Sequence, residues 1–413
     1  MFERVKPESV GLSGVRLQRI APWMDDYVHS GRFPGCLTAI LRRGELAYLD
    51  CRGMADPDSG RAVAEDTVFR IYSMTKPIVT AAAMTFFEEG RFQLDDPVAR
   101  FLPEFADTPV WVEGEGSAMR TEPAADSMKI WHLMSHTAGL VYGARNDSPV
   151  GAMCRENGID FSRRNGGSLA DTVRNLAKIP LRWQPGTRWE YSVATDVLGR
   201  LVEVLAEQSL DQALKHRIFD PFGMHETGFQ LQPGQLPRFA ALFNAKDGGL
   251  ELNERPDENA SHARDVTLCS GGGGLVSTVG DYLRFAEAIR CKGALGDARV
   301  GDARILGRRT VELMTMNHMP GNADLAAMGT PVHSETSYEG IGFGLGFSVV
   351  LDPATAKAAC STGEHAWGGA ASTAFWIDPV EDIVVVFMTQ VMPSSSYPIR
   401  RELRSLVYQA VID

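Results

Sequence analysis

The sequence predicts an α/β (α+β) fold in which an antiparallel sheet is flanked by N- and C-terminal helices and carries an inserted, mainly helical domain. Strand-like runs and amphipathic helical patterns occur near both ends of the chain, whereas helical patterns dominate its middle. A sheet must cover its apolar faces, so one sheet built from both ends and covered by the terminal helices is the simplest arrangement. We expect a discontinuous sheet domain over residues 1–72 and 269–413 and an insert over residues 73–268, with the functional site at their interface.

The N-terminal elements are a helix and a hairpin. The helix is predicted over residues 13–29, because apolar side chains recur there at spacings of three and four. These side chains are Leu17, Ile20, Trp23 and Tyr27. Residues 37–41 and 46–51 are rich in β-forming side chains and are separated by Arg43 and Gly44, which predicts a hairpin with its turn at these two residues.

The C-terminal elements mirror this arrangement. Residues 347–351, 373–377 and 383–388 are predicted strands, and Asp378 and Pro379 mark a turn between the last two. A final amphipathic helix is predicted over residues 399–411. Its apolar face consists of Leu403, Leu406, Val407 and Ala410.

The composition excludes several classes of protein. The 413 residues include 41 Lys plus Arg and 52 Asp plus Glu, and a net charge of -11 argues against a nucleic-acid partner. No run approaches the roughly 18 apolar residues of a membrane span. The first residues, MFERVKPES, lack the apolar core of a signal peptide, so we expect a cytoplasmic protein, with the mature form of an exported protein as the alternative. The six cysteines form no CxxC pair and are expected to be reduced.

The strongest local signal is the segment from Ile71 to Pro77, which precedes a helical pattern ending near Gly90. Proline is tolerated in the first turn of a helix, which places Ser73 at the helix N-terminus and Lys76 over it on the same face. A serine hydroxyl needs a base to become a nucleophile, and a lysine amine can act as one where burial or a second cation favours its neutral form. The alternative is a capping serine beside a solvated lysine, because S-x-x-K is common by chance.

Two further segments carry possible chemistry. Tyr191 lies just before a helical pattern that begins at Ala194, and beside a lysine cation its phenol could relay a proton. The alternative is a core tyrosine. Gly368 and Gly369 precede the predicted strand over residues 373–377, and paired glycines at a strand edge let a substrate approach closely. The alternative there is a bulge or a tight turn.

Together, and in this order, the three segments resemble the serine β-lactamase and penicillin-binding-protein superfamily. The closer resemblance is to the class C β-lactamase-like esterases called family VIII carboxylesterases. It extends over most of the chain, including residues 33–35, 67–70, 94–98, 132–140, 185–186 and 271–277. The resemblance implies the β-lactamase/transpeptidase-like fold.

The resemblance also implies roles for individual residues. Ser73 corresponds to the acylated nucleophile and Lys76 to the residue that activates it. Tyr191 corresponds to the second general acid and base, which protonates the leaving alkoxide and activates water. The backbone N–H groups of Ser73 and Ala370 would form the oxyanion hole.

Two departures from the family pattern bear on the substrate. Trp367 stands where β-lactamases carry the lysine of the K-T-G box, and Val193 stands where they carry the asparagine of the Y-A-N box. Groups that recognise a charged acyl-amino acid are therefore missing at these positions, whereas a neutral ester would gain apolar contact. With Gly368 and Gly369, these residues form the expected substrate-binding set.

We therefore expect a serine carboxylesterase that hydrolyses short-chain esters, with weak β-lactam hydrolysis as a side activity. No cofactor or metal is expected, and the partner is a small-molecule ester rather than nucleic acid or a membrane. A β-lactamase, a D-Ala-D-Ala carboxypeptidase, an acyltransferase and a non-catalytic binding protein remain as alternatives. The sequence does not define the oligomeric state.

Two other patterns have structural explanations. His132 and His136 are four residues apart, but no glutamate lies between them as in H-E-x-x-H zinc sites, so a structural turn after a helix is expected. The glycine run 271–274 lacks the G-K-[ST] of a phosphate loop, and we expect a turn beside the cleft. Ser277 and Thr278 follow it and predict a helix cap.

Overall fold

The computed structural model describes residues 2–161, 167–246, 248–295, 303–329 and 337–413. Its main feature is an eight-stranded sheet in the order β10-β11-β12-β13-β14-β1-β2-β3, in which all neighbours are antiparallel. The strands are β10 (Ile341–Phe343), β11 (Ser348–Val350), β12 (His365–Gly368), β13 (Ala374–Asp378), β14 (Ile383–Met388), β1 (Gly35–Arg42), β2 (Glu45–Asp56) and β3 (Arg61–Ala62). The predicted fold class is confirmed.

The two ends of the chain meet at the centre of this sheet. Strand β1 pairs with β14 in a register that places Ala39 opposite Val386, so sequence segments more than 300 residues apart form adjacent strands. The predicted hairpin is β1–β2. Its turn residues Arg43 and Gly44 have φ values of 55° and 84°, a left-handed pair that matches the twist of a two-residue hairpin.

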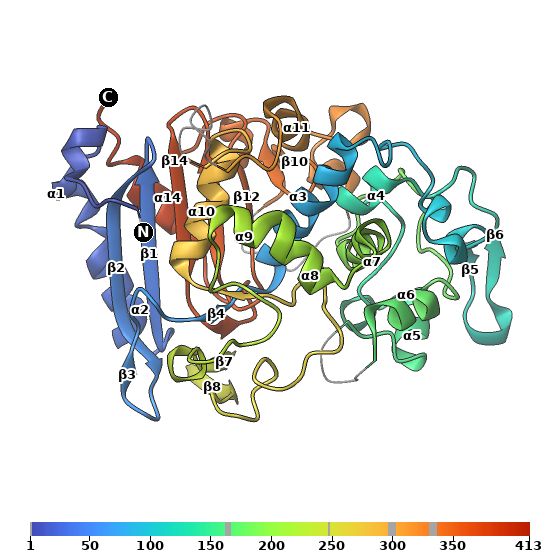
Figure 1. Cartoon of the computed structure of the whole chain (residues 1–413), viewed down its shortest axis with the longest axis horizontal. Coiled ribbons are helices and arrows are strands. Elements are labelled where there is room, and N and C mark those ends of the chain that lie inside the picture. Colours follow the sequence, from blue (N-terminus) through green and yellow to red (C-terminus); the bar gives the residue numbers. More distant parts are fainter. Residues whose placement is uncertain (1, 162–166, 247, 296–302, 330–336) are drawn as a thin grey trace.

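The terminal helices cover one face of the sheet, and α10 (Val279–Arg290) packs on the other (Figure 1). The helix predicted over residues 13–29 is divided into α1 (Gly14–Leu17) and α2 (Ile20–His29). Pro22 explains the break, because it has no N–H to donate to the carbonyl of Gln18. The C-terminal helix is α14 (Ile399–Tyr408), and Glu402 on it accepts hydrogen bonds from Trp23 and Tyr27 of α2.

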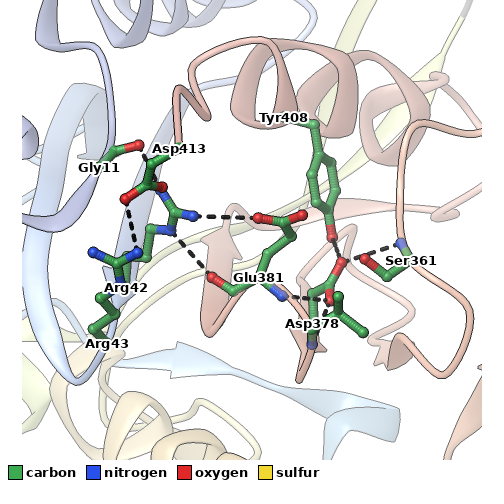
Figure 2. Close-up of polar contacts among 9 residues, drawn as sticks. Gly11, Arg42, Arg43, Ser361, Asp378, Glu381, Tyr408 and Asp413 are labelled. Carbon is green, nitrogen blue, oxygen red and sulfur yellow. Dashed lines mark hydrogen bonds and ion pairs between the residues drawn. The ribbon is translucent and has the colours of Figure 1, made fainter.

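Polar contacts fix the C-terminal segment to the sheet (Figure 2). The guanidinium of Arg42 on β1 pairs with Oδ1 of Asp413 at 2.7 Å and with Oε2 of Glu381 at 3.2 Å. Farther along the sheet, the Tyr408 hydroxyl donates to Oδ2 of Asp378 at 2.7 Å. These contacts join α14 and the last residues to the β13–β14 turn.

The segment between the two halves of the sheet is mainly helical. Figure 1 shows its helices α4 to α7 and the β5–β6 hairpin on the side of the molecule away from the terminal helices. The helices are α3 (Thr75–Glu88), α4 (Ile130–Met134), α5 (Pro149–Glu156), α6 (Leu169–Leu176), α7 (Ala194–Ala206), α8 (Leu210–Leu214) and α9 (Asp220–Phe222). The segment also contains the hairpins β5 (Val110–Glu113) with β6 (Arg120–Glu122) and β7 (Leu242–Lys246) with β8 (Gly249–Glu254).

Short strands join this segment to the C-terminal half of the sheet domain and join the two halves of the sheet domain to each other. Strand β15 (Val391–Met392) pairs in parallel with β7, and β4 (Phe69–Arg70) pairs with β9 (Val276–Ser277). The remaining helices are α11 (Arg308–Met314), α12 (Leu325–Met328) and α13 (Pro353–Ala356). We retain the division at residues 72 and 268 as a proposal. Over the described ranges, every helix is too short or too polar to cross a membrane.

Candidate active site

Ser73 lies at the N-terminal end of α3. It belongs to a short 3-10 helix, Tyr72–Met74, which leads directly into α3 at Thr75. Pro77 is the third residue of α3, in the first turn as predicted. Tyr72 has a φ of 44°, a left-handed conformation that a non-glycine residue adopts at a cost of about 1–3 kcal/mol. The chain therefore bends sharply just before Ser73, and the helix dipole favours negative charge at this position.

Lys76 is buried at the centre of the site, with an exposed fraction of 1%. Its Nζ lies 3.1 Å from Oγ of Ser73, 3.0 Å from Oη of Tyr142 and 2.6 Å from the carbonyl oxygen of Gly272. Three oxygens therefore lie within hydrogen-bonding distance of Nζ. The glycine run 271–274 thus forms a turn beside the site, and Thr278 after it caps α10 as predicted.

Tyr191 lies on the other side of the lysine, just before α7. Nζ of Lys76 is 4.6 Å from the centroid of the Tyr191 ring, and Nε1 of Trp367 donates to its Oη at 3.4 Å. Within the described ranges, the hydrogen bonds of the Tyr191 hydroxyl do not include Ser73 or Lys76. The face of the Tyr191 ring, rather than its hydroxyl, therefore lies toward Nζ of Lys76, while Trp367 orients the Tyr191 hydroxyl.

Strand β12 ends beside Ser73. Strand β11 pairs with β12 only at His365 and Ala366, so the edge beyond these residues faces the cleft. A Cβ on Gly369 would lie 2.4 Å from the carbonyl oxygen of Ile71, so only glycine allows the strand to approach the segment before Ser73 so closely. The next residue is Ala370. Among the described residues, no acceptor is hydrogen bonded to its backbone N–H.

A cleft of about 1250 Å³, part of it open to solvent, brings these elements together. It is lined by Ser73, Tyr191, Trp367, Gly368, Gly369 and Ala370. Val193 is buried at the start of α7 and is not among the lining residues. Cationic side chains also line the cleft, although the K-T-G position itself carries no positive charge. They are Arg145, Lys357, Arg400, Arg401 and Arg404.

Sequence reasoning missed two residues of the site. Tyr142 lies just after residues 132–140, which carry part of the family resemblance, and its hydroxyl contacts Nζ of Lys76. Burial, followed by the charges of Tyr191 and Asp196, raises the pKa of the Tyr142 phenol well above its usual value. Asp196 lies in the first turn of α7 and is buried behind the glycine run. Burial raises the pKa of its carboxyl, opposed by Ser270 and Lys76.

The two histidines serve the local structure. Nδ1 of His132 accepts the backbone N–H of Lys129 at 3.0 Å at the start of α4, and burial lowers the pKa of His132 to about 4. His136, just after α4, packs its ring 4.9 Å from that of Tyr191. Burial, with a smaller effect of Lys76, lowers the pKa of His136 well below its usual value, so this imidazole is neutral. In the described ranges, His, Cys, Asp and Glu side chains form no group of three suited to a metal ion.

Comparison with known proteins places this geometry in a family. The family model described as Beta-lactamase matches residues 20–409. The chain belongs to the β-lactamase family. Protein Rv1367c of Mycobacterium tuberculosis is 33% identical over 89% of this chain and 88% of its own length. Esterase EstB of Burkholderia gladioli is 31% identical over 94% of both chains.

A solved structure with a similar fold agrees with this assignment. It is described as EstCE1, a hydrolase with promiscuous acyltransferase activity, and superposes with a TM-score of 0.79 at 29% identity over 95% of this chain and 98% of its own. The resemblance inferred from the three sequence segments is thus confirmed at the level of the family and fold. Of the predicted site residues, Ser73, Lys76, Tyr191 and Trp367 lie together around one cleft.

Proposed function

We propose that the protein is a serine carboxylesterase that hydrolyses short-chain carboxylic esters through an acyl-enzyme on Ser73. The observation that carries the proposal is the 3.1 Å contact between Nζ of Lys76 and Oγ of Ser73 at the wall of an open cleft. A buried amine in hydrogen-bonding contact with a serine hydroxyl at a helix N-terminus is the arrangement that an activated nucleophile requires.

In the acylation step, Oγ of Ser73 attacks the ester carbonyl while neutral Lys76 accepts its proton. The backbone N–H groups of Ser73 and Ala370 hold the negative charge of the tetrahedral oxygen. The bond to the alcohol oxygen then breaks, and the phenol of Tyr191 gives its proton to the leaving alkoxide. The acyl-enzyme therefore holds a Lys76 ammonium over a Tyr191 phenolate, and the distance of 4.6 Å from Nζ to the ring centroid suits that ion pair.

Deacylation restores the starting protonation of Tyr191 and Lys76. Water attacks the acyl carbonyl and gives its proton to the Tyr191 phenolate. The bond to Oγ of Ser73 breaks, and the Lys76 ammonium returns the proton to the serine. Atoms and charges balance over the cycle, and no cofactor takes part in it.

The residues near Tyr191 favour an ester over a β-lactam. Trp367 offers an apolar surface to the cleft where β-lactamases present an ammonium. Val193, which is buried behind the cleft, removes the amide that β-lactamases carry at its position. Esterase EstB, 31% identical to this chain, supports the same choice. Other cationic side chains in the cleft, such as Arg145 and Arg401, supply positive charge that a charged β-lactam requires. The proposal therefore includes weak β-lactam hydrolysis as a side activity.

Replacement of the nucleophile tests the proposal. Ser73→Ala is expected to lower kcat for p-nitrophenyl butyrate by at least about 1000-fold while thermal unfolding stays unchanged. Ser59→Ala, at an exposed position, is the matched control. A fluorophosphonate probe should label wild-type Ser73, as located by mass spectrometry. Undiminished hydrolysis by Ser73→Ala would refute the esterase proposal, and a wild-type protein without an adduct would favour the non-catalytic alternative.

A second candidate function is acyl transfer to an alcohol. It is supported by EstCE1, whose description names promiscuous acyltransferase activity. Hydrolysis in the presence of a competing alcohol separates the two, because a transferase yields the new ester faster than the free acid. Faster turnover of nitrocefin than of p-nitrophenyl butyrate would instead favour a β-lactamase.

A further inference from the structure

A buried carboxylate behind the active site has one oxygen without a partner in the described part of the chain. Asp196 has an exposed fraction of 1%. Its Oδ1 accepts hydrogen bonds from Oγ of Ser270 at 2.6 Å and from the backbone N–H of Gly272 at 3.0 Å. Its Oδ2 is buried and bonds to none of the described residues. Buried polar atoms in native proteins are nearly always satisfied, so a donor is expected at Oδ2.

The hydroxyl proton of Tyr142 needs an acceptor. Its Oη lies 3.0 Å from Nζ of Lys76. If this oxygen accepts a hydrogen bond from the amine, the phenolic proton must be donated to another acceptor. Both Oη of Tyr142 and Oδ2 of Asp196 flank the Cα of Gly272, since a Cβ there would lie 3.1 Å from the first and 2.4 Å from the second. Glycine leaves this space open. The two oxygens are not hydrogen bonded directly in the structure, but a small side-chain rotation or one water molecule would join them.

We propose that Asp196 is a positioning residue that accepts the hydroxyl proton of Tyr142, directly or through one water, and so makes the Tyr142 oxygen an acceptor toward Lys76. The proposal rests on the proposed function, in which neutral Lys76 is the base for Ser73. A neutral amine has two N–H donors and one lone pair. The carbonyl of Gly272 takes one donor and Oη of Tyr142 takes the other, so the lone pair is left for the Ser73 hydroxyl.

The reverse orientation of the Tyr142 hydroxyl would hinder proton transfer from Ser73 to Lys76. Its O–H would point at the lone pair of Lys76 and compete with Ser73 for the only basic site of the amine. Asp196 prevents this competition because a carboxylate oxygen accepts hydrogen bonds and donates none. The role is therefore to orient the base, without contact between Asp196 and the substrate.

Asp196→Asn tests this role with little other change. Its amide oxygen can keep the bonds from Ser270 and Gly272, while its NH₂ group faces Tyr142 and reverses the polarity of that one contact. We expect kcat/KM for p-nitrophenyl butyrate to fall about tenfold to 100-fold. The rate of fluorophosphonate labelling should fall in parallel, whereas its final stoichiometry stays at one per chain, because the protein remains folded.

The double variant Asp196→Asn/Tyr142→Phe gives the decisive comparison. Tyr142→Phe removes the misdirected hydroxyl, so the double variant should be at least as active as Asp196→Asn alone. Multiplicative losses from the two substitutions would overturn the proposal, because they would mean that Asp196 does not act through Tyr142. Wild-type activity of Asp196→Asn would overturn it as well.

Two further results keep this test separate from that of the proposed function. If Ser73→Ala is inactive but Asp196→Asn is fully active, only the role of Asp196 fails. If Asp196→Asn does not fold, a high-resolution crystal structure of the unaltered protein decides. Contact of Asp196 Oδ2 with Tyr142 Oη, directly or through one ordered water, supports the proposal, and the absence of both overturns it.

Discussion

The indole Nε1 of Trp367 donates a hydrogen bond of 3.4 Å to the Oη of Tyr191, and the two ring centroids lie 5.3 Å apart. The residue that replaces the K-T-G lysine therefore contacts the phenol to which we assign proton transfer. Because an indole N–H only donates, it leaves the phenolic proton free to reach the substrate and stabilises a phenolate once that proton is lost.

Trp367→Phe should therefore slow the chemical step more than it weakens substrate binding. Phenylalanine keeps the apolar wall but removes the donor, so we expect kcat for p-nitrophenyl butyrate to fall about five- to tenfold with KM nearly unchanged. Trp111→Phe is the matched control, because its indole N–H bonds to the carbonyl of Gly114, outside the residues that line the cleft. A higher KM at constant kcat would show that Trp367 only binds substrate.

Lys76→Met should abolish activity while the fold is kept. Methionine fills the buried volume with an unbranched side chain but supplies no base, and loss of a general base costs about 100- to 10,000-fold in rate. Fluorophosphonate labelling of Ser73 should slow to the same extent. The exposed Lys178→Met serves as control. Near-normal labelling of the Lys76 variant would assign the base to another residue, Tyr191 first among them.

The sequence predicted those features that depend on local patterns. Strand β14 runs from Ile383 to Met388 as expected, and α7 begins at Ala194, because short apolar runs and capped helical windows carry their own signal. The contact between Ser73 and Lys76 follows from helical spacing alone. The division of the first helix was not predicted, because the apolar spacing from Leu17 to Tyr27 continues across Pro22 without a break.

Features that depend on tertiary packing could not be predicted. Tyr142 and Asp196 lie 54 residues apart in the sequence, and only packing of α7 against α4 and the glycine run brings them to Lys76. Strands β15 and β7 likewise pair, although nothing in their two sequences indicates that they are neighbours. Arg400, Arg401 and Arg404 of α14 line the cleft only because the tertiary fold brings α14 to it. Comparing the K-T-G position alone with that of β-lactamases therefore underestimated the positive charge of the cleft.

Arg42→Met should destabilise the fold without touching the active site. The Arg42 side chain is 3% exposed and pairs with Glu381 and Asp413, which keep access to solvent (Figure 2). Its loss also removes a donor to the carbonyl of Gly11, and we expect the free energy of unfolding to fall by about 2–3 kcal/mol. Arg43→Met removes a 48% exposed partner of the same Asp413 and should cost less than about 1 kcal/mol in urea unfolding. Equal costs would contradict the role of burial.

The stability of the protein should fall below pH 6.5, and His365 should account for part of the loss. This residue on β12 is buried and its Nδ1 lies 3.0 Å from the carbonyl oxygen of Gly363. Burial lowers the pKa of His365 from 6.5 to about 4. Between these values the unfolded chain binds the proton more tightly than the folded one, so each pH unit costs up to about 1.4 kcal/mol, and the loss is complete near pH 4.

Urea unfolding at several pH values between 7 and 4 measures this dependence. His365→Gln, which retains an amide donor for Gly363, should reduce the slope between pH 6.5 and 4, because its side chain does not titrate there. Part of the slope should remain, because burial also lowers the pKa of His132 to about 4 and that of His136 well below its usual value. The substitution His29→Gln, at an exposed position, should leave the slope as it is in the wild type. An unchanged slope in His365→Gln would mean that the folded protein accepts a proton on His365 as readily as the unfolded chain does.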